Sequence, residues 1–80
     1  MPEIFRFYGY SFFFYSREHE PMHVHVEGNG GYAVYDFLNW TIKLRDAQGI
    51  KANDLRKIEQ VIIDNKQTII NKWQEHFGRL

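Results

Sequence analysis

The pattern of apolar and polar residues changes once along the chain, near residue 50. Before that point, short runs of aromatic and β-branched residues are separated by turn residues, which is typical of strands. After it, apolar residues recur at helical spacing, and neither Gly nor Pro occurs again until Gly78. The sequence therefore predicts a single domain, with a sheet part over residues 1–49 and a helical part over residues 50–80.

Turn residues divide the first half into four or five strands. Gly28 to Gly31 is expected to close a hairpin, because Gly and Asn tolerate positive φ. Gly9 is expected to interrupt the first strand as a bulge or bend, and Asp46 to Gly49 to form a turn. The strands so defined span residues 4–8, 10–16, 23–27, 32–38 and 40–45.

The second half carries two apolar stripes. They consist of Leu55, Ile58, Val61 and Ile62, and of Ile69, Ile70, Trp73 and Phe77. A single helix bearing both stripes would be roughly 36 Å long at about 1.5 Å per residue, too long for a compact domain of this size. We expect Asn53 to cap the first helix and Gly78 to end the last one. Asp64 and Asn65 interrupt the stripes, and Asn tolerates a left-handed cap there.

Together these patterns predict a two-layer α+β fold. An antiparallel meander of four to five strands is followed by two C-terminal helices, or by one strongly bent helix. Phe12 and Phe14 alternate with Phe13 and Tyr15, so both faces of the sheet carry aromatic side chains. One helical layer covers only one face. We therefore expect a homodimer that packs sheet on sheet through the second, aromatic face.

Composition and charge narrow the classes of function. The chain has 80 residues, no cysteine and net charge 0, and 18% of its residues are aromatic. Large rings supply buried area that a small domain without disulfides needs. The neutral balance gives no support to nucleic acid as a partner, because phosphate binding favours a basic surface. No apolar run approaches a membrane span and no signal peptide is recognisable, so we expect a cytoplasmic protein without a membrane partner.

One cluster of residues suggests chemistry. Three of the four histidines lie within a short segment that also holds acidic residues. On a strand, His23, His25 and Glu27 would share one face at intervals of about 6–7 Å. Val24 and Val26 would point the other way, into the core.

Two functional interpretations of this cluster involve catalysis or metal binding. Imidazoles and a carboxylate are ligands for divalent Zn, Fe or Mn. The candidate metal ligands are His19, His23, His25 and Glu27. Alternatively, two imidazoles that titrate near neutral pH act as general acid and general base, for example on a ribose hydroxyl. The candidate catalytic residues are His19, His23 and His25.

Two further interpretations need no chemistry. The cluster recognises a partner or an anion by hydrogen bonds, or its members are polar residues that pair across strands with Tyr10, Tyr32 or Asp36. His76 lies in the last helical turn, where it would serve as a capping group. The residues alone leave all of these interpretations open.

With these motifs in view, the sequence resembles a small bacterial family, the domain of unknown function numbered 4160. The resemblance rests on the block Phe12 to Ser16, the turn His19–Glu20–Pro21, the segment His23 to Glu27, and the helical residues Trp73 and Phe77. It implies a small prokaryotic cytoplasmic protein. It also implies the toxin-like component of a toxin–antitoxin-like pair, encoded beside a small cognate protein.

The leading hypothesis is therefore a homodimeric interaction module that binds a small cognate protein. In the family motif, the matching positions are His19, His23 and His25. The alternative is a His-dependent ribonuclease or a metal-dependent hydrolase that uses these three histidines.

Overall fold

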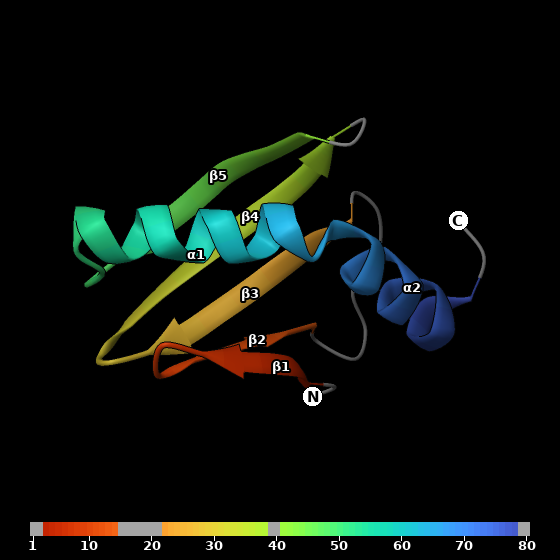
Figure 1. The fold of residues 1–80 in the computed structure, drawn as a ribbon, viewed down its shortest axis with the longest axis horizontal. Helices are drawn as coiled ribbons and strands as arrows, with labels where there is room; N and C mark the ends of the chain where they lie inside the picture. Colours follow the sequence, from red (N-terminus) through yellow and green to blue (C-terminus); the bar gives the residue numbers. More distant parts are fainter. Residues whose placement is uncertain (1–2, 15–21, 39–40, 79–80) are drawn as a thin grey trace.

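A computed structural model describes residues 3–14, 22–38 and 41–78 of this protein (Figure 1). These ranges contain a five-stranded antiparallel sheet in which each strand pairs with the next in order, followed by two helices. The elements are β1 (Glu3–Phe7), β2 (Tyr10–Phe13), β3 (His23–Gly28), β4 (Gly31–Leu38), β5 (Thr41–Gln48), α1 (Ala52–Asp64) and α2 (Lys66–Phe77). The predicted α+β meander with two C-terminal helices is confirmed.

Two tight turns join the first four strands in pairs. Asn29 and Gly30 have φ of 49° and 81°, the positive values that a type I′ hairpin turn requires at both central positions. Tyr8 and Gly9 repeat this pattern with φ of 53° and 79°. The predicted irregularity at Gly9 is thus a hairpin turn between β1 and β2. The ends of two predicted strands, residues 15–16 and residue 40, lie outside the described residues.

The prediction of a turn over Asp46 to Gly49 is wrong. β5 continues to Gln48, which pairs with Tyr32, and the chain turns only at Gly49, where φ is 72°. A register shift in the pairing of β4 with β5, opposite Val34, admits one extra residue into β5. This bulge lets the backbone of Asp46 and the residues after it stay paired with β4.

The start of α1 also differs from the expectation. Its N-cap is Lys51, which is extended (φ −68°, ψ 152°) and forms no side-chain capping bond. The first intrahelical bond runs from the Leu55 N–H to the Lys51 carbonyl at 2.9 Å. Asn53 therefore lies inside the first turn, and its side-chain oxygen accepts a hydrogen bond from Arg56. The capping role predicted for Asn53 is wrong because the helix begins one residue before it.

The two helices are separate, and they meet at Asn65. Its backbone does not take the left-handed cap conformation that Asn tolerates, because φ is −117° and ψ is 22°. Its N–H donates to the carbonyls of Val61 and Ile62, and its side-chain Nδ2 donates to the Val61 carbonyl at 2.8 Å. The side chain thus satisfies an end carbonyl without a left-handed cap. Gly78, with φ 84°, ends α2 as predicted.

The core lies between the sheet and the helices. Figure 1 shows α1 lying across one face of the sheet and α2 continuing past it, near the start of β3. Val24 and Val26 are fully buried, as predicted, and pack with Ile58 and Ile62 of α1. Trp73 of α2 is also buried. Neither described helix is both long and apolar enough to cross a membrane.

Candidate functional site

The histidine strand β3 contributes side chains to the sheet face turned away from α1, which we call the outer face. Residues directly opposite each other in antiparallel strands share a face, so the register of β3 with β2 and β4 identifies the members. They are Ser11 and Phe13 on β2, His23, His25 and Glu27 on β3, and Tyr32, Val34 and Asp36 on β4. The predicted common face of the two histidines and Glu27 is therefore confirmed.

The structure brings two of the candidate histidines together, in different surroundings. The rings of His23 and His25 lie 5.2 Å apart between centroids, at 70°. His23 is only 5% exposed and its ring lies 5.9 Å from that of Trp73, so it is packed against α2. His25 is half-buried, and its ring stacks on Phe13 at 5.5 Å and 20°. His25 is thus the more accessible of the two.

The predicted metal site is tested only in part. Within residues 3–14, 22–38 and 41–78, no three His, Asp or Glu side chains come together in a group that could hold a metal ion. The candidate His19 lies outside the described residues. Metal binding and acid–base catalysis by the histidine cluster therefore stay predictions.

Two hollows meet at Glu27 on the outer face. One, of about 300 Å³, is lined by His25, Glu27 and Tyr32 together with neighbouring residues of β3 and β4. The other, of about 390 Å³, is lined by Arg6, Ser11 and Glu27 with the adjoining turn backbone. Glu27 is exposed, and its carboxylate forms no hydrogen bond or ion pair with any residue that the structure describes.

The next carboxylate along this surface is already engaged. Glu3 accepts hydrogen bonds from the Ser11 hydroxyl at 2.6 Å and from Arg6 Nε at 2.8 Å. Both bonds hold the pKa of Glu3 below its ordinary value, and the bond from Ser11 has the larger effect. Sequence reasoning missed this network, for which the residue spacing gave no signal, because it depends on the register between β1 and β2.

Two more of the described acids near the outer face, Asp36 and Asp46, are engaged as well. Arg45 Nε donates to Asp36 at 3.1 Å, and its Nη2 forms an ion pair with the same carboxylate. The Tyr32 hydroxyl donates to Asp46 at 2.9 Å, and this hydrogen bond raises the pKa of Tyr32. Glu27 therefore stands out as an acid of this face that no described residue engages.

The second face carries the predicted aromatic Phe13, but this ring is not exposed. Phe13 is 3% exposed and Val34 9% exposed in the single chain, so neither presents an open apolar surface. Tyr15, the other aromatic expected there, lies outside the described residues. Tyr10 does not lie opposite a histidine. It pairs with Gly28, and its ring is buried in the core. The sheet-on-sheet homodimer stays a prediction. Phe13 is already buried within the single chain, so its burial does not require a dimer.

His76 lies apart in the fold, on α2. It lines a hollow of about 300 Å³ with Glu3, Lys72 and other residues. The final capping bond of α2 is made by the Gly78 N–H, which donates to the Gln74 carbonyl at 2.9 Å. His76 thus shares this hollow with Glu3, at the edge of the outer face, and does not line either of the two hollows beside Glu27.

Comparison with known proteins gives one result. No curated protein and no solved structure matches the chain. A family model described as a domain of unknown function, DUF4160, matches residues 9–74. This range runs from the start of β2 into α2, and it includes His23, His25 and Glu27. Because the match covers most of its length, the chain belongs to the DUF4160 family.

Proposed function

We propose that this protein is an interaction module of a toxin–antitoxin-like pair, and that its outer face binds a small cognate protein. The proposal joins the family resemblance, which implies such a pair, with the chemistry of this face. The toxin-like role and the cognate protein both belong to the proposal.

The position of Glu27 is the observation that carries the proposal. Its carboxylate is exposed between two hollows, while the acids around it are engaged by Arg6, Arg45 and tyrosine or serine hydroxyls. A Lys or Arg of the cognate protein would find there a carboxylate that no described residue engages. The hollows on either side would receive its neighbouring side chains, with His25 and Tyr32 supplying hydrogen bonds.

The charges of the outer face favour a protein over a nucleic acid as the partner. Among the residues that the structure describes, three basic ones stand against four acidic ones on and beside this face. The basic residues are Arg6, Lys43 and Arg45. The acidic residues are Glu3, Glu27, Asp36 and Asp46. A surface with this balance lacks the excess of Lys and Arg that binding to a phosphate backbone needs. It suits a partner that presents a mixed or basic surface.

The test is co-expression with the small protein encoded beside this chain, followed by co-elution on a sizing column. Wild-type chain is expected to co-elute with that protein, and Glu27→Lys is expected to abolish co-elution, because it sets like charges against each other. The control is Gln74→Lys, on the exposed surface of α2 and outside the hollow that reaches Glu3, which should leave co-elution intact.

Either of two results would overturn the proposal. Absence of co-elution for the wild-type chain argues against the pair. Co-elution that survives Glu27→Lys places the interface elsewhere. Urea unfolding of both variants separates a binding defect from a folding defect, because substitutions at exposed positions usually change stability by less than about 0.5 kcal/mol.

A second candidate function is a His-dependent ribonuclease or metal-dependent hydrolase. The observation in its favour is that His25 and Glu27 line one hollow, with His23 next to His25. Elemental analysis of the purified protein, with His25→Ala for comparison, tests the metal version. RNA cleavage that is lost in His25→Ala would support the metal-free version, and an inactive, metal-free wild-type protein would contradict both.

A further inference from the structure

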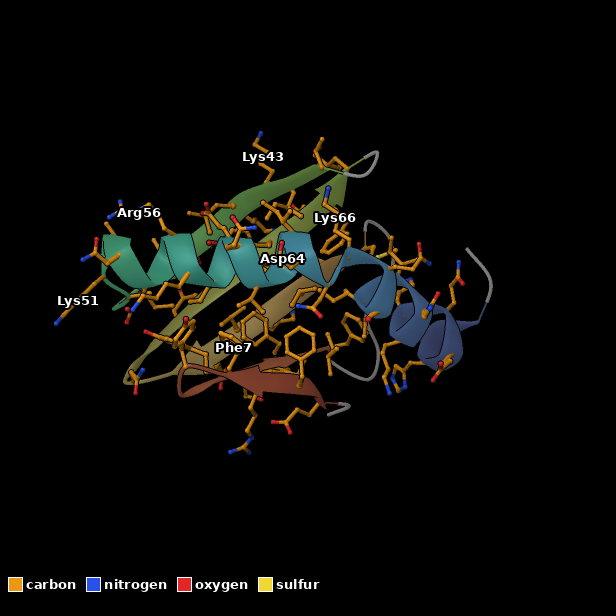
Figure 2. The ribbon with its side chains drawn as sticks, in the orientation of Figure 1. Phe7, Lys43, Lys51, Arg56, Asp64 and Lys66 are labelled. Atoms are coloured by element: carbon orange, nitrogen blue, oxygen red, sulfur yellow. The ribbon has the colours of Figure 1, made fainter. Side chains whose placement is uncertain are left out.

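A second surface lies between the first hairpin turn and α1, which we call the hairpin–helix groove. It is a hollow of about 210 Å³ lined by Phe7, Tyr8, Lys57, Gln60, Val61 and Asp64. Figure 2 shows Phe7 in the space between β1 and α1, and Asp64 on α1 itself. None of these residues belongs to the outer face.

The groove holds the most exposed aromatic rings of the described residues. Phe7 is 44% exposed and Tyr8 58%, and their rings meet edge to face at 4.4 Å. Tyr8 has φ 53°, a left-handed conformation that bulky residues rarely adopt and that Asn or Gly would adopt more easily. The chain thus keeps an aromatic ring in water at a strained position. Such strain is concentrated at functional sites.

The α1 side of the groove carries opposite charges at its two ends. Lys57, Gln60 and Asp64 follow one another at helical spacing along one face of α1. Lys57 and Asp64 are two turns apart, about 10 Å along the axis. The Lys57 ammonium lies 5.0 Å from the centre of the Tyr8 ring. Gln60 Nε2 donates to Asp64 at 2.8 Å.

We propose that the hairpin–helix groove binds a second copy of this chain, in a two-fold symmetric dimer with the two α1 helices antiparallel. In that arrangement Lys57 of each copy meets Asp64 of the other, and Gln60 lies near the axis. The rings of Phe7 and Tyr8 are buried between the copies.

Charge complementarity identifies the occupant. A two-fold interface uses the same patch on both copies, so residue i meets residue j and j meets i. The stripe on α1 has a cation, Lys57, at one end and an anion, Asp64, at the other. When two copies of it lie antiparallel, each cation faces the anion of the other copy. The zero net charge of the chain adds no long-range repulsion between copies. This proposal keeps the homodimer but moves it from the outer face, where Phe13 is already buried, to the groove.

The dimer is tested by light scattering on a sizing column and by sedimentation, each over a range of concentrations. Wild-type protein is expected to dimerise. Lys57→Glu and Asp64→Lys are each expected to weaken the dimer by about tenfold or more, because both attractive pairs become repulsive. The control Lys43→Glu, on β5, should leave the dimer unchanged.

The decisive arm mixes the two variants. A Lys57→Glu chain and an Asp64→Lys chain carry complementary stripes, so the mixture is expected to form heterodimers at concentrations where each variant alone is mostly monomeric. The double variant is expected to dimerise with itself again. A monomeric wild-type protein, a dimer that tolerates Lys57→Glu, or a mixture that stays monomeric would each overturn the proposal.

Tyr8→Asn separates the interface from the fold. Asn suits the left-handed position in a type I′ turn, so the unfolding midpoint should be unchanged or higher. Loss of the ring should at the same time weaken the dimer. A variant that dimerises as tightly as the wild type would show that Tyr8 is not part of the interface.

Discussion

The hydroxyl of Tyr35 on β4 donates a 2.9 Å hydrogen bond to the carboxylate of Glu59 on α1. A second bond of the same kind, 2.8 Å long, joins Tyr10 on β2 to Asp54 in the first turn of α1. Both tyrosine rings are almost completely buried, at 1% and 2% exposure. Two rings in the core thus hold two carboxylates of α1, and this pairing fixes where the helix lies over the sheet.

Removing the Tyr35 hydroxyl should weaken the fold more than removing an exposed one. Tyr35→Phe leaves the half-buried Glu59 carboxylate without its donor, and we expect a loss of about 1–2 kcal/mol in the free energy of unfolding. Tyr32→Phe, which removes the exposed bond to Asp46, is the control and should cost less. Urea unfolding measures both variants. Equal losses would show that burial of the Tyr35 bond adds nothing.

The same tyrosines should make the protein unstable at alkaline pH. Burial raises the pKa of Tyr35, and the hydrogen bond to Glu59 raises it further. Burial also raises the pKa of Tyr10. Above about pH 10 the unfolded chain therefore loses these protons while the folded chain keeps them. Stability is fully present below that pH and falls as the pH rises through the raised values.

Urea unfolding across this alkaline range measures the effect. The slope of stability against pH should be smaller in Tyr35→Phe than in the wild type, because that variant has lost one of the two buried titrating groups. An unchanged slope in the variant would contradict the assignment to Tyr35.

Local backbone chemistry explains which features the sequence could predict. Asn29 and Gly30 tolerate positive φ wherever they occur, and alternation alone sends Val24 and Val26 to the core. The bond from Tyr10 to Asp54 was not predicted, because it is a contact made across the fold rather than along the chain. Features set by such distant contacts have no signature in local spacing.

The candidate site shows the same division. The common face of His25 and Glu27 follows from strand geometry and was predicted. The burial of Phe13 and the engagement of Glu3 depend on the pairing of β2 with its two neighbours. The groove depends on the approach of Lys57 to Tyr8, which only the packed structure shows.

Gly28 is expected to be the glycine least tolerant of substitution. A Cβ there would lie 2.2 Å from the Gly9 carbonyl oxygen, so the turn between β1 and β2 would have to move. We expect Gly28→Ala to cost about 1–3 kcal/mol by overpacking. Gly30→Ala has open space around it and costs only its positive φ, about 1 kcal/mol. Thermal or urea unfolding ranks the two, and a larger loss at Gly30 would contradict the close approach.

Substitution of Ser11 should change the titration of Glu3. The Ser11 hydroxyl is the largest cause of the lowered pKa of that carboxyl, and Arg6 comes second. Ser11→Ala is therefore expected to raise the pKa of Glu3 toward its ordinary value near 4.5, and Arg6→Gln to raise it by less. Titration of the Glu3 side-chain carboxyl by NMR measures both shifts.

The lowered pKa of Glu3 also has a consequence for stability. A lowered pKa in the folded state stabilises the fold above the unfolded value, and this contribution is lost as the pH falls through the folded value. Ser11→Ala should thus lose less stability than the wild type on acidification below about pH 4.5. If Arg6→Gln instead raised the pKa of Glu3 further than Ser11→Ala, charge rather than the hydroxyl would control this carboxylate. A partner's cation approaching the outer face would then compete with Arg6 for Glu3 as well as bind Glu27.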